Sequence, residues 1–376
     1  MDFSLTDEQT LLQDSVSKFL QNDYGFEQRQ KTIKEEPGYS TAHWSQFAEL
    51  GWLAMPFPEE DGGFGGTAIE TMLMQEQFGK GLVVEPFLPT VVLAGTALRM
   101  AGNEAQKAQY LAGIIEGSVQ GALAFVEPQA RFNLADVAVT AKQGGSGYVL
   151  NGHKAVVLNG PSANVFVVSA RTSGEQRDDS GISLFLVPAD ATGVSRRDYP
   201  TVDGMRASEV TFTDCEVGAD ALLGAEGEGL PVLQRVIDEG TLAVGCEAVG
   251  CMEVLYKATV EYCKTREQFG KPIGKFQVLQ HRMVDMFMEH EQSKSLMFMA
   301  AMRMEEGYND EAQKAVSAFK VQVGKSGRFV GQQAVQLHGG MGMTEELNVG
   351  HYFKRLTTID TLFGNVDFHL KRFGSL

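Results

Sequence analysis

The chain has 376 residues, of which 43% are hydrophobic, and a formal net charge of −16. This length and apolar content suffice for about two or three domains with substantial cores. The acidic charge argues against partners such as nucleic acid or an anionic membrane surface, and no apolar run approaches the ~18–20 residues of a membrane span.

The first residues, MDFSLTDEQT, contain neither a basic segment nor an apolar segment, so no secretory signal or transit peptide is expected. The four cysteines (Cys215, Cys246, Cys251, Cys263) form no C-x-x-C pair, and the last three lie in one helix-like segment. We therefore expect reduced thiols in the core of a cytoplasmic protein, without a metal site.

The first part of the chain is predicted to be helical. In LTDEQTLLQDSVSKFL, apolar residues recur at helical spacing, and Thr6 with Gln9 is typical of a capping box. A glycine-rich stretch, EEDGGFGG at 59–66, is expected to be a loop between helices. Its use as a phosphate-binding loop is the weaker alternative, because no strand precedes it and its three carboxylates repel phosphate.

The hydrophobic pattern changes to that of strands near Gly121. The runs VFVVSA, ISLFLVPA and SEVTFTDCEV are strand-like, and YVLNGHKAVVL suggests a hairpin with a type I′ turn at Asn151-Gly152. Residues 119–227 are therefore predicted to form a β domain.

From about Gly229 the chain is again helical, with long amphipathic runs predicted at 232–265, 275–306 and 310–337. Long helices with short connections favour an antiparallel bundle. Small residues in the first run would let another helix approach closely (Ala243, Gly245, Ala248, Gly250). The predicted fold is α+β multidomain: helical residues 1–118, β residues 119–227 and a helical bundle at 228–376.

Two motifs in the last region have the chemistry of a nucleotide site. In KTREQFGKPIGKFQ, the permanent cation Arg266 is followed by an amide, an aromatic ring and a glycine turn, which suits a diphosphate attached to a flat ring. In QQAVQLHGGMGMTEE, Gly339 and Gly340 let the backbone approach a ligand. A helix C-cap at Arg266 and Gly270, and a plain turn at Gly339-Gly340, are the alternatives.

Taken together and in order, these segments resemble the acyl-CoA dehydrogenase family over nearly the whole chain. The resemblance includes GWLAMPFPEEDGGFGG, LAFVEP, LNGHKAVVLNG, DGMRASEVTFTDCEV, REQFGKPIGKFQ and QLHGGMG. It implies an N-terminal α-helical domain, a middle β-barrel-like domain and a C-terminal four-helix bundle. It also implies FAD as cofactor, an acyl-CoA thioester as substrate and an electron-transfer flavoprotein as electron acceptor.

In this family FAD lies across a subunit interface. The resemblance implies that Arg266 contacts the FAD diphosphate, with Gln268, Phe269 and Gln277 at the same end. The adenosine-diphosphate part would be held by a second segment of the same chain, Gln336, Leu337, His338, Gly339 and Gly340. A capped or core histidine is an equally open interpretation of His338.

The position that the family uses for its catalytic base is altered. The family's usual Glu-Gly pair falls here on Phe363 and Gly364, and a phenyl ring accepts no proton. Asp360 lies three residues earlier and need not face the same site. Some members instead carry the Glu on the first bundle helix. That position is Gly240 here, and the neighbouring Glu239 is turned by ~100° around the helix.

The positions that face the flavin ring are altered as well. The Thr before Glu127 is Val126, the Trp and Thr of the Trp-Ile-Thr segment are Val156 and Leu158, and the Gly-Ala-Gly-Ser loop is the bulkier QARF starting at Gln129. Hydroxyl donors to the flavin ring are thus lost, whereas the groups that the chain would lend to a neighbour's FAD are present.

The pattern predicts a non-catalytic subunit that completes the FAD site of a different, catalytic chain in a heterotetramer. It is similar to the small subunits of heteromeric bacterial enzymes acting on pimeloyl-CoA or steroid side-chain thioesters. Three alternatives remain open: a homomeric dehydrogenase that uses Glu239, or Glu247 about two turns further on; a flavin monooxygenase-like relative; and a pseudoenzyme that binds no flavin.

Overall fold

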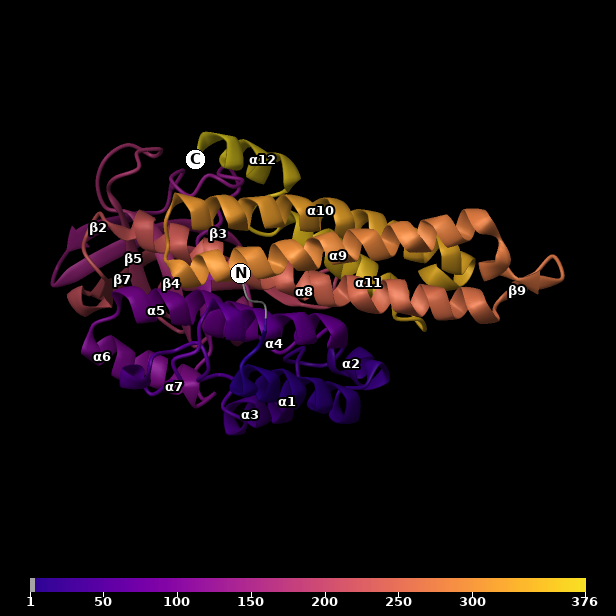
Figure 1. The fold of residues 1–376 in the computed structure, drawn as a ribbon. Helices are drawn as coiled ribbons and strands as arrows, with labels where there is room; N and C mark the ends of the chain where they lie inside the picture. Colours follow the sequence, from indigo (N-terminus) through magenta and orange to yellow (C-terminus); the bar gives the residue numbers. More distant parts are fainter. Residues whose placement is uncertain (1–3) are drawn as a thin grey trace. The chain divides into compact units, whose positions relative to one another are not determined.

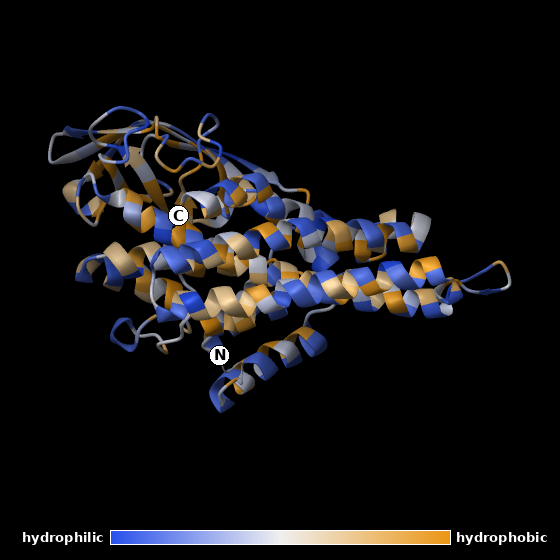
Figure 2. Ribbon diagram, turned by 45° about the horizontal axis from the view of Figure 1, so that its top comes forward, coloured by the Kyte–Doolittle hydropathy of each residue, from blue (hydrophilic) through white to orange (hydrophobic). Residues whose placement is uncertain are grey.

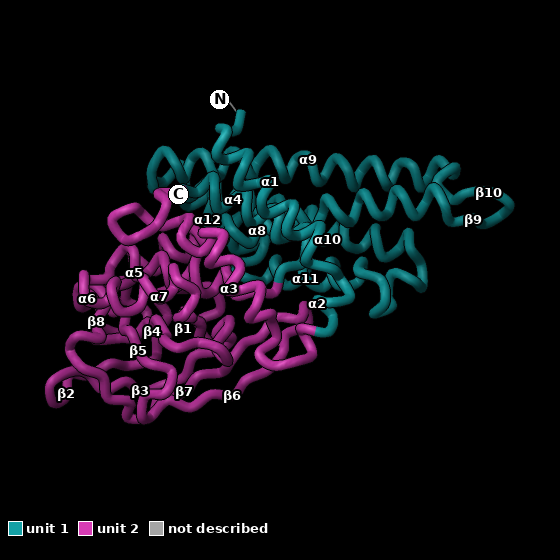
Figure 3. The backbone as a smooth tube through the Cα atoms, turned by 90° about the horizontal axis from the view of Figure 1, so that it is seen from below, with its two compact units in different colours: residues 1–31, 67–83, 241–376 teal, residues 32–66, 84–240 magenta. Residues whose placement is uncertain are grey.

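The computed structural model describes residues 4–376 and divides into two compact units, which are coloured separately in Figure 3. One unit comprises residues 1–31, 67–83 and 241–376, and the other comprises residues 32–66 and 84–240. The predicted order of helical, β and helical regions is confirmed (Figure 1). The predicted domain boundaries at 118 and 227 stay a prediction, because each compact unit gathers separate stretches of the chain.

The helical unit is built from amphipathic helices. They are α1 (Asp7–Asp23), α2 (Phe26–Thr32), α4 (Ala68–Gly81), most of α8 (Gly229–Thr265), α9 (Gln277–Glu306), α10 (Asp310–His338), α11 (Val349–Thr361) and α12 (Val366–Ser375). The predicted runs correspond to α8, α9 and α10 within a few residues, and the Thr6–Gln9 capping box of α1 is present. Figure 2 shows hydrophilic and hydrophobic residues alternating along the long helices, as expected for helices with one buried face.

The β-containing unit has a mixed sheet whose described strands run in the order β6-β7-β3-β2-β4-β5-β8, with β1 beside β4. The strands are β1 (Gly121–Ala124), β2 (Thr140–Gly144), β3 (Gly147–Leu158), β4 (Val165–Arg171), β5 (Ile182–Pro188), β6 (Val194–Pro200), β7 (Arg206–Gly218) and β8 (Leu222–Leu223). Inward-facing apolar residues of several strands, among them Phe166, Phe185 and Phe212, form its core.

Short helices complete the β-containing unit. They are α3 (Thr41–Glu49), η1 (Glu59–Asp61), the π-helix η2 (Leu88–Gly95), α5 (Thr96–Ala101), α6 (Glu104–Gln106), η3 (Lys107–Leu111), α7 (Ala112–Ile115), η4 (Gly160–Ser162) and η5 (Ala219–Ala221). The stretch predicted as a loop at 59–66 begins with the short 3-10 helix η1, and only the glycine-containing part after Asp61 is a loop. In the part of the chain that the structure describes, no helix combines the length and apolar character that a membrane span requires.

The predicted turn at Asn151-Gly152 is wrong. Strand β3 continues through both residues, and the hairpin closes instead between β2 and β3 near Gly145. Gly152 has φ +140°, outside the left-handed helical values of a type I′ turn. It lies where the register between β3 and β7 shifts, so the Asn-Gly pair marks a β-bulge.

The small residues of α8 let two other helices approach closely, as the sequence predicts. A Cβ atom on Gly250 would lie 1.9 Å from the carbonyl oxygen of Glu76 in α4, and one on Gly245 would lie 2.4 Å from the ring of Phe319 in α10. Reciprocally, a Cβ atom on Gly79 of α4 would lie 1.9 Å from the carbonyl oxygen of Glu247. The backbones of α4 and α8 are thus in direct contact.

Replacing Gly250 by alanine should destabilise the protein, because the new methyl group collides with the backbone of α4, which cannot rotate away. We expect a loss of about 1–3 kcal/mol, typical of overpacking in a core. The matched control is Gly374→Ala in α12, where no atom lies within 4 Å of the added Cβ; helix propensity alone should stabilise this variant slightly. Chemical denaturation measures both, and equal stability of the two variants would contradict the close approach.

Candidate functional site

The two nucleotide-type motifs meet where α8 and α10 end. The ring of Tyr262, in the last turn of α8, lies 4.3 Å from that of His338 at the end of α10, with 30° between the planes. The Tyr262 hydroxyl also donates a hydrogen bond to the His338 carbonyl oxygen over 3.4 Å. Two residues that are 76 positions apart in the sequence are therefore neighbours in space. Both motifs lie at the surface, at one end of the helical unit.

A tight hairpin follows Arg266 and presents an aromatic ring to solvent. Its strands are β9 (Glu267–Gln268) and β10 (Lys271–Pro272), and both central residues have positive φ, +56° at Phe269 and +77° at Gly270. These values are those of a type I′ turn, which is rare for a phenylalanine. The Phe269 side chain is 90% exposed, so burial does not explain its conformation. The hairpin instead holds the ring outward.

Most of the predicted nucleotide ligands are exposed and available to a partner molecule. They are Arg266, Gln268, Phe269, Gln277, Gln336, Gly339 and Gly340. Gly339 has φ +60°, consistent with the turn that ends α10, and a Cβ on Gly339 or Gly340 would meet no atom within 4 Å. Packing within the chain therefore does not explain Gly340, whereas close approach of a ligand would.

Leu337 and His338 are buried, in contrast to their neighbours. The His338 Nδ1–H donates to the Ala334 carbonyl oxygen over 2.8 Å, and burial lowers the pKa of His338. The neutral ring therefore belongs to the core of the bundle, as one of the two sequence interpretations expects. The contacts predicted between these two residues and a nucleotide stay predictions.

The usual base position is occupied by a buried apolar side chain. Phe363 is 9% exposed and has φ +58° in the turn between α11 and α12. The nearby Asp360 carboxylate is also buried, and its Oδ2 accepts a hydrogen bond of 2.8 Å from Arg328 Nη2. Asp360 is therefore paired through one oxygen with an arginine whose side chain is largely exposed, whereas its buried Oδ1 has no hydrogen-bond partner among the residues that the structure describes.

The other two candidate carboxylates are held by arginines. Glu239 accepts from Arg99 Nη2 at 2.9 Å and from Arg235 Nε at 2.7 Å, and its other oxygen accepts from the Thr96 hydroxyl at 3.0 Å. Glu247 is buried and receives both its hydrogen bonds, each 2.6 Å long, from the Nε and Nη2 atoms of Arg355. Such a two-pronged pair satisfies both carboxylate oxygens, so neither side chain is poised to take a proton from a substrate.

The positions that would face a flavin ring lie around a strained bulge in β3. Val156 has φ +50°, an outlier for a β-branched residue, and its side chain is 42% exposed. Strain of this kind costs of order 1–3 kcal/mol and concentrates at functional sites. The Val126 carbonyl oxygen accepts a hydrogen bond from the Ala155 N–H over 2.8 Å, so Val126 is tied directly to this bulge.

Sequence reasoning missed the ion pair that anchors this region. Lys154 Nζ lies 2.7 Å from Glu127 Oε1, and both side chains are buried. Burial lowers the pKa of Lys154 to about 8, although Glu127 opposes the shift; burial raises the pKa of Glu127, but the charge of Lys154 and several hydrogen bonds outweigh it and lower the pKa. The sequence signal that could have revealed the pair is the position of Lys154, which the alternation of β3 places on the inward face, where a lysine needs an acidic partner.

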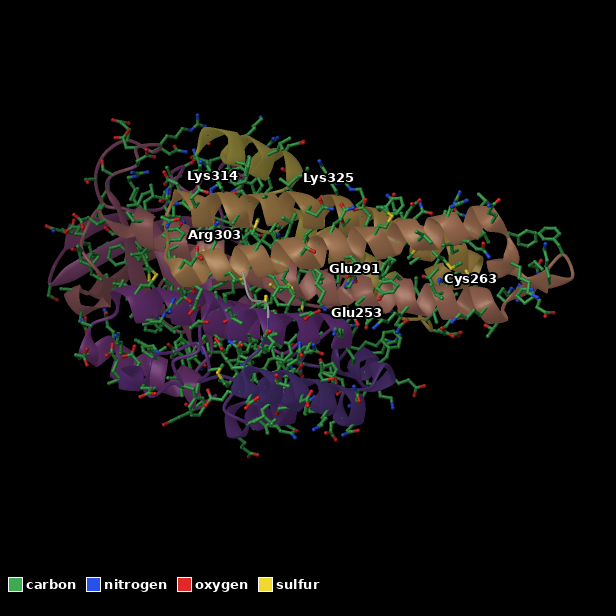
Figure 4. All side chains as sticks on the ribbon, viewed as in Figure 1. Glu253, Cys263, Glu291, Arg303, Lys314 and Lys325 are labelled. Atoms are coloured by element: carbon green, nitrogen blue, oxygen red, sulfur yellow. The ribbon has the colours of Figure 1, made fainter. Side chains whose placement is uncertain are left out.

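A second missed residue is Lys320, which is fully buried in α10. In the sequence it falls on the apolar stripe of α10 with Val316, Phe319 and Val323, which is where a lysine is least expected. Figure 4 shows Lys314 and Lys325 along the outer side of the same helix. Unlike these two lysines, Lys320 has no access to water, so its amino group needs a hydrogen-bond acceptor inside the protein.

Family models and relatives identify what the whole chain is similar to. Models of the acyl-CoA dehydrogenase N-terminal, middle and C-terminal domains match residues 6–118, 122–215 and 227–374. The short-chain-specific acyl-CoA dehydrogenase of Megasphaera elsdenii is 30% identical, over 94% of this chain and 94% of the relative.

Solved structures of the same kind superimpose on the full chain. Butyryl-CoA dehydrogenase from Megasphaera elsdenii has a TM-score of 0.92 and 28% identity, covering 100% of this chain and 99% of its own. A chain of the ChsE4-ChsE5 complex from Mycobacterium tuberculosis has a TM-score of 0.90 and 26% identity, covering 100% of this chain and 98% of its own.

Removing one partner of the buried Lys154–Glu127 pair should be strongly destabilising. Lys154→Met leaves the Glu127 carboxylate in the core without its cation, for which we expect a loss of about 3–5 kcal/mol. The double variant Lys154→Met/Glu127→Leu removes both charges and should recover much of this loss. Urea unfolding of the three proteins measures the difference. A single variant as stable as the unchanged chain would contradict the pairing.

Acid should destabilise the protein through the buried His369. Burial, aided by the charge of Lys320, lowers the pKa of His369 to about 3, whereas an unfolded histidine titrates near ~6.5. The unfolded chain therefore binds the extra proton first, so the contribution of His369 is complete above about pH 6.5 and is lost as the pH falls towards 3.

His369→Gln keeps a side-chain N–H donor but cannot be protonated. We expect the variant to lose stability less steeply on acidification, by about 1.4 kcal/mol per pH unit within this window. Denaturation midpoints recorded between pH 4 and 7 measure the slope. Identical slopes for the two proteins would show that His369 is not held neutral.

Proposed function

The chain belongs to the acyl-CoA dehydrogenase family, and we propose on this basis that it is the non-catalytic, FAD-completing subunit of a heteromeric acyl-CoA dehydrogenase. FAD-dependent dehydrogenation of acyl-CoA thioesters is the activity of the family. In the proposed complex a different chain supplies the catalytic glutamate. This chain contributes the residues at the ends of α8 and α10 to the partner's FAD site.

The residues at the ends of α8 and α10 fit a dinucleotide. Gly339 and Gly340 leave open space where side chains would otherwise stand, and Arg266 is an exposed guanidinium beside an exposed aromatic ring. No ion pair engages Arg266 within residues 4–376, so its charge is available to a diphosphate. When bound, FAD would accept the two electrons that the substrate loses together with one hydrogen each from Cα and Cβ.

The chain's own residues would bind and orient the cofactor from outside the partner. The guanidinium of Arg266 can hold diphosphate oxygens with parallel N–H donors. The Phe269 ring, fixed outward by its hairpin, offers a flat apolar surface. The backbone at Gly339 and Gly340 can approach the nucleotide without a Cβ in between. None of these roles requires this chain to move a proton.

The observation that carries the proposal is that every carboxylate considered as a possible base is bound by at least one arginine. Phe363 occupies the usual glutamate position, and the three carboxylates considered as alternatives are engaged by arginines: Asp360 by Arg328, Glu239 by Arg99 and Arg235, and Glu247 by Arg355. A site that must abstract a proton α to a thioester needs a carboxylate within reach of the substrate. A partner that brings this carboxylate resolves the deficit.

The ChsE4-ChsE5 complex, named as a pair of chains, supports assembly with a different subunit. By analogy with heteromeric members, a steroid side-chain or dicarboxylic acyl-CoA thioester is the proposed substrate class, and an electron-transfer flavoprotein is the proposed acceptor. Arrangement as a heterotetramer would give two working FAD sites for every four chains.

The second candidate is a self-sufficient homomeric dehydrogenase, which the short-chain-specific relatives favour. Such an enzyme would need Glu239 or Glu247 as its base, and each would first have to leave its arginine partners. Glu239→Gln and Glu247→Gln separate the two candidates, because either substitution should abolish turnover in a homomeric enzyme that relies on that residue. A flavin monooxygenase-like activity needs no such base, and oxygen consumption with reduced flavin would reveal it.

The proposal predicts that the chain purified alone lacks the yellow colour of bound flavin, whereas co-expression with its partner yields active, yellow protein. The flavin absorbance relative to the protein concentration should give two FAD per four chains. Four FAD per four chains, or active flavoprotein made from this chain alone, would refute the half-site assignment.

Arg266→Ala in the complex should weaken FAD binding roughly 10- to 100-fold, since a charge-assisted hydrogen bond is worth about 1.5–3 kcal/mol. The control is Lys371→Ala, which removes a cation from the exposed side of α12. Flavin fluorescence released on dilution measures the affinity. An unchanged affinity in Arg266→Ala would show that Arg266 does not hold the diphosphate.

A further inference from the structure

The turn between α11 and α12 is held by two buried polar side chains that no step of the proposed function uses. Lys320 Nζ donates to the carbonyl oxygens of Asp360 and Gly364, over 3.1 and 2.6 Å, and His369 Nε2 donates to that of Phe363 over 3.1 Å. Lys320 comes from α10 and His369 from α12. Three backbone carbonyls of one short turn are thus fixed by side chains of two helices.

One of these three acceptors, the Asp360 carbonyl oxygen, belongs to the last turn of α11. Carbonyl oxygens in a last turn have no partner within their own helix, and the negative end of the helix dipole favours a cation there. The other two, of Phe363 and Gly364, belong to the turn that follows the helix. Burial lowers the pKa of Lys320 to about 7, so both the ammonium and the neutral amine are present near neutral pH. Each form carries at least two N–H donors and can bind two carbonyl oxygens at once.

The turn, fixed by these hydrogen bonds, keeps Phe363 in an unfavourable backbone conformation. Its φ of +58° is unfavourable for any residue with a Cβ, and such strain persists only where the surroundings impose it. Gly364, with φ +116°, cannot take a side chain either, because a Cβ there would lie 2.4 Å from Phe368 and 2.7 Å from His369 Nε2. The direction of the Phe363 side chain is therefore determined by its neighbours.

We propose that Phe363 is a plug: held in the base position by Lys320 and His369, its ring fills the space that an acyl thioester would need at this chain's own site. This inference rests on the proposed function. Phe363 is then a specificity-determining residue of the complex, because it directs substrate to the partner chain's site. Lys320 and His369 are positioning residues, since they act only through the turn.

The plug differs from a mere loss of the base. A chain without its glutamate could still bind acyl-CoA unproductively and remove substrate from the working site. In the proposal, the ring of Phe363, which is nine-tenths buried, takes the place of the substrate and so prevents this binding. The burial of Phe363 and the three hydrogen bonds to its turn are what a device for excluding ligand requires.

The test counts acyl-CoA sites on the intact complex by isothermal titration calorimetry. The probe is acetoacetyl-CoA, whose C3 is already a carbonyl, so the Cα–Cβ bond is not dehydrogenated. The unchanged complex should bind one probe molecule per pair of chains. Phe363→Gly should raise this to two, and glycine suits the positive φ at this position, so the turn is expected to survive. Phe363→Asn, which also tolerates positive φ, is the second variant.

The matched control is Phe373→Ala in α12, which also removes an aromatic ring but from a half-exposed position; it should leave one site per pair. One site per pair in both Phe363 variants would overturn the plug and leave the half-site function standing. Two sites per pair in the unchanged complex would overturn both, because substrate would then bind with Phe363 in place.

Lys320→Met tests the positioning role with a readout that stability alone does not change. If Lys320 holds the plug, the variant should bind a second probe molecule, more weakly than Phe363→Gly does, although Phe363 is still present. A folded Lys320→Met complex that keeps one site per pair would remove Lys320 from the proposal. Where this variant does not fold, the Phe363 variants still decide the plug.

Discussion

A charge that leaves water must find a partner, and this constraint determines where the acidic side chains of this protein lie. Transfer of an unpaired carboxylate into a protein interior is costly enough that the group must be neutralised, paired or left at the surface. Glu127 and Glu247 each lie beside a buried lysine or arginine, and the buried Asp360 is paired with the exposed Arg328. A carboxylate engaged in this way supports the fold and is withdrawn from acid-base chemistry, which is the physical basis for reading the chain as a subunit that does not itself abstract protons.

A buried ion pair can also support the backbone beside a candidate binding site without itself contacting the ligand. The Glu127–Lys154 pair anchors the segment that leads to Val126, next to a strained bulge at Val156. The ion pair and the bulge therefore fix the backbone at the positions where the family resemblance would place a flavin ring. In the same way, the turn at Phe363 is held by Lys320 and His369. Both sets of buried contacts stabilise the fold whatever the neighbouring side chains present to a ligand.

The long helices and most strands were predictable because their signals are local and repeated. The apolar period of α8, α9 and α10 extends over many turns, so their bounds were predicted within a few residues. The turn predicted at Asn151-Gly152 was wrong because the same dipeptide occurs in tight turns and in β-bulges. Only the pairing of β3 with β7 distinguishes the two. The exposure of Arg266 and Phe269 agreed with a role towards a partner molecule, although their contacts with FAD remain predictions. Lys320 was missed because a single lysine on an apolar stripe shows neither its burial nor the turn that it supports.

The hairpin at Phe269 has a consequence for how the subunits would come together. Its φ values are already those of a type I′ turn, and the ring is held outward before any partner arrives. The conformational cost of presenting this ring is therefore met during folding, and association would not have to freeze a mobile loop. A preorganised contact of this kind loses little conformational entropy on binding, which favours a long-lived complex. An isolated copy of this chain would instead expose the apolar ring of Phe269 to water.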